Sequence, residues 1–109
     1  MGLAFRTVLL TVAVAASFSM ASPAAVAAEY RITIAKMKFG APAETLHVGD
    51  VIVWRNDDIF RHTATARDKS FDVDLPPKSE KRMTARHSGA VNFYCRFHPA
   101  MVGVLDVRP

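Results

Sequence analysis

A cysteine, a histidine and a methionine lie at intervals of three residues near the end of the 109-residue chain. They are Cys95, His98 and Met101 in the stretch YCRFHPAM, and Cys95 is the only cysteine in the sequence. A single cysteine cannot form an internal disulfide, so a metal site is the alternative use for this thiol. Thiolate, imidazole and thioether are soft donors that favour copper over magnesium or calcium, while zinc rarely selects methionine.

A second imidazole would complete a trigonal set of two histidines and one cysteine with a weak axial methionine. His62 is the candidate, because it follows the polar loop in NDDIFRHTATA and begins a β-prone run. It could therefore lie at the same end of the domain as the Cys95 loop. His47 and His87 stand beside turn residues and are interpreted as surface side chains. The predicted metal ligands are His62, Cys95, His98 and Met101.

The N-terminal segment has the pattern of a secretory signal peptide. Arg6 precedes a short apolar run, and small residues that suit a cleavage site end at Ala27 or Ala28. The run is too short and too interrupted for a transmembrane anchor. We therefore expect residues 1–28 to be a signal peptide, residues 29–109 to be the mature domain, and the mature protein to be periplasmic.

The mature region is long enough for one small domain. The chain has 14 Lys and Arg against 10 Asp and Glu, so loss of Arg6 leaves thirteen positive residues and a net charge of about +3. These positive residues are mostly spread singly along the sequence. Their distribution does not suit nucleic acid, and it predicts a bias toward an acidic partner.

Short β-prone segments separated by turn residues run through the mature region. YRITIAKMKF alternates apolar and polar residues, and VIVWR is a nearly continuous apolar run. FRHTATA, KRMTA, AVNFYC and MVGVLDV are further strand-like segments. Seven or eight short strands and no helix predict an all-β fold, an antiparallel Greek-key sandwich or barrel.

Strand alternation predicts the direction of the cysteine side chain. In AVNFYC, Val91, Phe93 and Cys95 share one face, and the first two suit a core. Cys95 should therefore point inward where its strand ends. A tight loop over residues 96–100 would then aim the three donors at one point, stiffened by Pro99.

These features together resemble the cupredoxins, the small type 1 blue copper proteins, from about Tyr30 to the C-terminus. The Cys-x2-His-x2-Met spacing with proline after histidine is most like amicyanin, and VGDVIVWRNDDIFRHT is similar to the family's strand, polar loop and first histidine. The resemblance implies a cupredoxin fold and one type 1 copper ion bound by the four predicted ligands. It also implies a monomeric, non-enzymatic carrier of single electrons between redox proteins, such as a c-type cytochrome and a dehydrogenase like methylamine dehydrogenase.

One residue departs from the family pattern. Amicyanin-like proteins usually have asparagine after the first histidine ligand, where it helps to tie the two ligand loops together, whereas this chain has Thr63.

Two other functions fit the donor set. A copper-delivery protein would release its metal to an acceptor, and a copper oxidase or reductase subunit would need a further metal centre for which only His47 and His87 remain.

Overall fold

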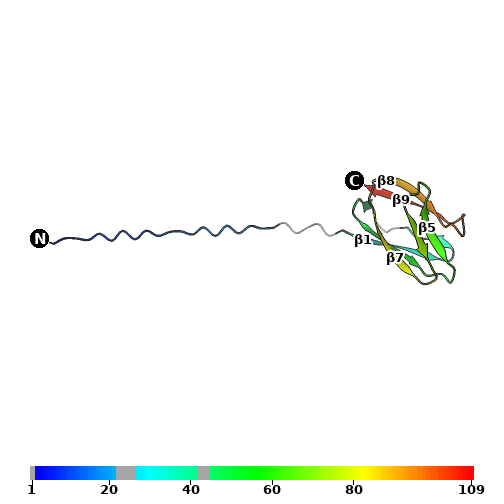
Figure 1. Ribbon diagram of the computed structural model, residues 1–109, viewed down its shortest axis with the longest axis horizontal. Helices are drawn as coiled ribbons and strands as arrows, with labels where there is room; N and C mark the ends of the chain where they lie inside the picture. The colour runs from blue at the N-terminus through cyan, green and yellow to red at the C-terminus, as the bar shows by residue number, and fades with distance from the viewer. Residues whose placement is uncertain (1, 22–26, 42–44) are drawn as a thin grey trace.

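The computed structural model describes residues 2–21, 27–41 and 45–109, and these residues form nine β-strands and no helix. The strands make two packed sheets, and the β8–β9 connection lies at the end of the sandwich away from the C-terminus (Figure 1). The strands are β1 Glu29–Ala35, β2 Lys38–Phe39, β3 Leu46–His47, β4 Val51–Asn56, β5 His62–Ala66, β6 Asp72–Leu75, β7 Glu80–Thr84, β8 Gly89–Tyr94 and β9 Val102–Arg108.

The predicted signal peptide is only partly described, because residues 1 and 22–26 lie outside the described part. Residues 2–21 form neither helix nor strand, and their side chains are exposed. In the described ranges, no helix has the length and hydropathy that crossing a membrane requires.

The predicted all-β sandwich is confirmed, with a mixed rather than purely antiparallel pairing. One sheet has the order β2-β1-β4-β7 and the other β3-β9-β8-β5-β6. Most neighbours are antiparallel, but β1 pairs with β4 and β3 with β9 in parallel. The segment between β1 and β4 visits the opposite sheet at β3 before returning, which supplies the long connection that a parallel pair needs.

Two elements differ from the segments that the sequence predicted. YRITIAKMKF is a hairpin of β1 and β2, joined at Lys36 and Met37, whose φ angles of 51° and 62° reverse the chain. Strand β6 was not predicted, because Asp72 and Asp74 are residues that strands usually lack. It lies at the edge of its sheet, where charged side chains discourage pairing with other chains.

An aromatic cluster forms the centre of the core between the sheets. The Phe93 ring lies 5.2 Å from that of Trp54 and 4.8 Å from that of Phe39, in edge-to-face arrangements. Such contacts add to the stabilisation from burial. Phe93 and Cys95 are 2% and 0% exposed, which confirms that the cysteine continues the inward face of β8.

Gly103 on β9 makes this position of Phe93 possible. The two residues are opposite each other in the antiparallel register of β8 and β9. A Cβ atom added to Gly103 would lie 2.3 Å from Cζ of the Phe93 ring, which is far inside van der Waals contact. The ring occupies the space of the missing side chain, so any larger residue must displace it.

We predict that Gly103→Ala lowers the free energy of unfolding by about 1–3 kcal/mol, the usual cost of overpacking a core. Urea denaturation of the copper-free protein measures this change. Val104→Ala, at an exposed position of the same strand, should change it by less than about 0.5 kcal/mol. Equal effects of the two substitutions would show that Phe93 does not depend on the glycine.

Candidate metal centre

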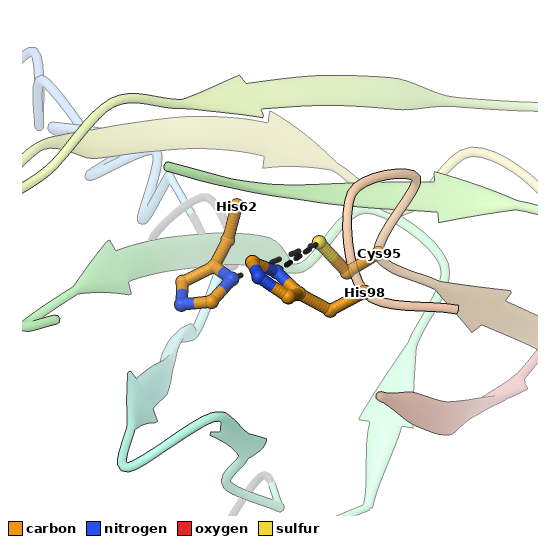
Figure 2. A group of neighbouring side chains, drawn as sticks. All are labelled: His62, Cys95 and His98. Atoms are coloured by element: carbon orange, nitrogen blue, oxygen red, sulfur yellow. Dashed lines mark hydrogen bonds between the residues drawn. The ribbon is translucent and has the colours of Figure 1, made fainter. Parts of the chain in front are cut away.

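Three predicted ligands converge at one end of the sandwich. His62 begins β5, whereas Cys95 and His98 belong to the loop between β8 and β9. Figure 2 shows their side chains pointing toward one another. Cys95 Sγ lies 3.7 Å from His62 Nδ1 and 3.8 Å from His98 Nδ1, and the three donor atoms all lie within 4.8 Å of one another. His62 and Cys95 are fully buried, while His98 is half-buried.

The spacing of three residues in the Cys95 loop coincides with two consecutive turns. The His98 N–H donates to the Cys95 carbonyl at 3.3 Å, and the Met101 N–H donates to the His98 carbonyl at 2.8 Å. The Cys95 N–H then donates to the Met101 carbonyl at 3.1 Å and closes the loop. Each predicted ligand in this loop therefore stands at the end of a hydrogen-bonded turn, which fixes where its side chain begins.

Met101 returns to the core where the loop closes. Its side chain is 6% exposed and packs in the same buried cluster as Cys95. The backbone bond to Cys95 holds the two residues next to each other across the mouth of the loop. Met101 thus lies next to Cys95, while the three closely spaced donor atoms belong to the cysteine and the histidines.

The donor distances fit a transition-metal ion. Bonds of about 2.3 Å to sulfur and 2.0 Å to nitrogen, at an angle of about 120°, would place the two atoms about 3.7 Å apart. The two sulfur–nitrogen distances of 3.7 and 3.8 Å match this requirement. The thiolate, two imidazoles and neighbouring thioether favour copper among such ions.

Asp58 holds His62 from the side away from the cysteine. His62 Nε2 lies 2.8 Å from Asp58 Oδ2. A carboxylate only accepts hydrogen bonds, so the imidazole proton belongs on Nε2 and the lone pair of Nδ1 faces Cys95. A carboxylate behind a histidine is a common way to orient the ring and raise its basicity toward a metal.

The same carboxylate stabilises the β1–β2 turn. Lys36 N–H and Met37 N–H donate to the two Asp58 oxygens at 2.8 and 3.0 Å. Burial raises the pKa of Asp58, but the bonds from Met37 N–H, from His62 and from Lys36 N–H together outweigh it and hold the pKa below its ordinary value. Sequence reasoning missed Asp58, although its position four residues before His62 in a polar loop was visible.

Thr63 occupies the position where the family pattern has asparagine, and it connects the two ligand segments. Its N–H donates to Cys95 Sγ at 3.4 Å, and its Oγ1 accepts a bond from the Arg96 N–H at 2.9 Å. The hydroxyl thus makes a tie between the ligand loops that does not require an amide side chain. His47 and His87 are both exposed and lie outside the donor group, in agreement with their interpretation as surface residues.

Comparisons with known proteins identify both a family and similar folds. A family model described as a cupredoxin-like domain matches residues 7–107. The reduced state of an amicyanin variant with a proline-to-phenylalanine substitution is 24% identical, with a TM-score of 0.62 over 73% of this chain and 82% of that chain. A reduced Cu(I) form at pH 4 of a proline-to-glycine amicyanin variant is 26% identical, with a TM-score of 0.62 over the same shares.

A reduced tryptophan-to-tyrosine variant of amicyanin is 25% identical, with a TM-score of 0.62 over 78% of this chain and 88% of that chain. No protein with a curated description matches the chain.

We predict that Asp58 makes the stability of the copper-free protein sensitive to acid. Hydrogen bonds from the Met37 and Lys36 N–H groups and from His62 hold the pKa of Asp58 in the folded protein below its ordinary value of 3.8, so its contribution to stability is fully present above pH 3.8 and is lost as the pH falls through the folded pKa. Asp58→Asn should therefore lower the free energy of unfolding at neutral pH, and the difference from the unmodified protein should shrink below pH 3.8.

Urea denaturation at neutral pH and at a pH below 3.8 measures this difference in the free energy of unfolding. Asp106→Asn serves as the control, because Asp106 is an exposed carboxyl on β9. Its effect should be small at both pH values. A difference for Asp58→Asn that is independent of pH would contradict the assignment.

Proposed function

The chain belongs to the cupredoxin-like domain family, and we propose that it is a type 1 copper protein that carries single electrons between redox partners. The observation that carries the proposal is the buried approach of Cys95 Sγ to the Nδ1 atoms of His62 and His98. These three residues would bind the ion, and the Met101 thioether would be a weaker fourth ligand. Bound copper would supply a couple of Cu(II) and Cu(I).

The protein's own part in this function is to hold the donors still. Asp58 orients His62, the turns of the loop orient Cys95 and His98, and Thr63 joins the two segments. Burial of Cys95 and His62 keeps water away from the sulfur and from one imidazole. Donors held in this way do not need to rearrange when the charge of the ion changes, which favours fast electron transfer.

Exposed apolar side chains near the half-buried histidine suit brief docking. Ile59, Phe60 and Phe97 are 74%, 52% and 50% exposed, and the Phe60 ring lies 6.3 Å from that of His98. We propose that electrons pass through the His98 edge to partners that cover this patch. A small apolar contact excludes water at the exit atom without the large interface that would slow release.

The arginines beside this patch are paired. Arg61 forms a salt bridge with Asp74, and Arg96 Nε lies 3.2 Å from Asp72 Oδ1. Both guanidinium groups also lie over the Phe97 ring, at 5.9 and 5.7 Å from its centroid. The acidic partner predicted from the sequence remains our proposal, but these pairs reduce the local positive charge. The electrostatic attraction of an acidic partner therefore depends mainly on the net charge of the mature domain.

We also propose that the mature domain is periplasmic and follows a removed signal peptide. The start of β1 at Glu29 supports this division. The Ala28 carbonyl accepts a bond from the Val51 N–H at 2.9 Å, and cleavage after Ala27 would retain this bond. Mass spectrometry of the exported protein would show the cleavage site, and an uncleaved chain would contradict the proposal.

We predict that addition of Cu(II) to the protein gives an intense visible absorption band from charge transfer between sulfur and copper. Cys95→Ser should lose this band, because the hydroxyl cannot supply the thiolate. A band that survives the substitution would exclude Cys95 as the ligand. Repeated reduction and oxidation should leave copper bound, whereas loss of copper on each reduction would favour the copper-delivery function instead.

Ala100 is exposed in the ligand loop, two residues after His98. We predict that Ala100→Glu slows electron transfer to a redox partner by roughly tenfold or more, since a charge buried in an apolar contact is costly. Stopped-flow kinetics with a c-type cytochrome measures the second-order rate constant. Ala90→Glu adds the same charge at an exposed position near the opposite end of β8. It should change the rate much less, and the copper spectra of both variants should be unaltered. Equal slowing by both would contradict docking at the His98 end.

A further inference from the structure

A chain of hydroxyl groups leads away from the cysteine ligand to a carboxylate on the edge strand. Thr63 and Thr65 are two residues apart on β5, are 0% and 9% exposed, and have their Oγ1 atoms 2.9 Å apart. Thr65 Oγ1 donates to Asp72 Oδ1 at 2.8 Å, and the two residues are opposite each other in the β5–β6 register. At the other end, Thr63 Oγ1 accepts the Arg96 N–H at 2.9 Å.

The direction of every hydrogen bond in this chain follows from the Asp72 carboxylate. A carboxylate only accepts, so Thr65 must give its single hydroxyl proton to Asp72. The Thr65 oxygen therefore accepts the proton of Thr63, and the Thr63 oxygen accepts the Arg96 N–H. All the protons point the same way, from the backbone of Arg96 to Asp72, and bonds aligned in this manner strengthen one another.

Both contacts of Thr63 with the ligand loop concern the cysteine. The Arg96 N–H is the amide directly after Cys95, and the Thr63 N–H donates to Cys95 Sγ itself at 3.4 Å. Arg96 Nε also lies 3.2 Å from Asp72 Oδ1. Arg96 therefore contacts both ends of the hydroxyl chain, Thr63 through its backbone N–H and Asp72 through its side chain. The hydroxyl chain thus holds Thr63 where its N–H contacts the Cys95 sulfur and its hydroxyl contacts the Arg96 N–H.

We propose that Thr65 and Asp72 are positioning residues for Cys95, acting through Thr63. This inference rests on the proposed copper function and deepens it, because it assigns the control of the sulfur to residues that touch no metal ligand. Without the Thr65 hydroxyl, the buried Thr63 hydroxyl loses its acceptor, and the loop that carries Cys95 is held less firmly against β5.

The predicted effect on the copper site has a definite sign. A donor to the sulfur stabilises negative charge there, and the sulfur carries more of that charge when the bound copper is reduced. Hydrogen bonding around the cysteine sulfur is one of the factors that set the potential of such sites. A weaker Thr63 N–H bond should therefore lower the reduction potential.

Thr65→Val and Thr65→Ser test the proposal as a pair, because valine keeps the shape of the side chain and serine keeps the hydroxyl. The first readout needs no copper. Reaction of Cys95 with an aromatic disulfide reagent requires the loop to open. In Thr65→Val the buried Thr63 hydroxyl has no acceptor, which destabilises the closed loop and should speed this reaction by about tenfold. The rate in Thr65→Ser should stay close to that of the unmodified protein.

Global destabilisation must be separated from loop opening. The free energy of unfolding of each variant is measured in urea, and the faster thiol reaction must exceed what that change alone predicts. Thr33→Val, on β1 of the other sheet, is the matched control and should not accelerate the reaction. Acceleration fully explained by global stability, or equal in Thr65→Ser, would overturn the positioning role.

The second readout uses protein loaded with Cu(II). The reduction potential should fall and the sulfur-to-copper band should shift in Thr65→Val but not in Thr65→Ser. If the unmodified protein shows the band while Thr65→Val leaves the potential, the band and the thiol rate unchanged, the hydroxyl chain has no such role. If the unmodified protein shows no band, the copper function is wrong, and the thiol reaction still decides whether the chain positions Cys95.

Discussion

The close approach of one thiol sulfur to two imidazole nitrogens is the constraint on which the rest of the structure depends. Three polar donors at 3.7 and 3.8 Å in a largely buried site must be held there by the surrounding chain. The two halves of the group come from segments more than thirty residues apart, β5 and the β8–β9 loop. Antiparallel pairing of β5 with β8, at Thr65 with Tyr94, brings these segments side by side.

Two carboxylates are connected to the donor group, Asp58 before β5 and Asp72 on β6. Asp58 contacts His62 directly and also binds the β1–β2 turn, so the position of one ligand is coupled to a hairpin of the other sheet. Asp72 is linked to the cysteine through Thr65 and Thr63, and it also contacts the side chain of Arg96, the residue after Cys95. The core supports the same end of the sandwich, because Gly103 allows Phe93 to pack and Phe93 precedes Cys95 by two residues on the inward face.

The convergence of Cys95 with the two histidines could be predicted from the sequence because each of the two segments carries a local signal. Cys95, His98 and Met101 follow one another at the interval of a hydrogen-bonded turn, and His62 begins a strand directly after a polar loop. The all-β class followed from alternation and turn residues. Alternation does not distinguish a parallel from an antiparallel neighbour, so the parallel pairs of β1 with β4 and β3 with β9 could not be predicted. Asp72 was missed because its contacts with Thr65 and Arg96 join separate segments. Asp58 lies only four residues before His62, but its bonds to the β1–β2 turn also join separate segments.

X-ray absorption at the copper edge of the copper-loaded, unmodified protein tests the central claim most directly, because it reports the atoms bound to the ion. We expect a first shell with one short bond to sulfur and two bonds to imidazole nitrogen, in both the oxidised and the reduced protein. The more distant thioether should contribute weakly, if at all. A first shell made only of nitrogen and oxygen would place the ion away from Cys95 and would exclude the proposed copper site.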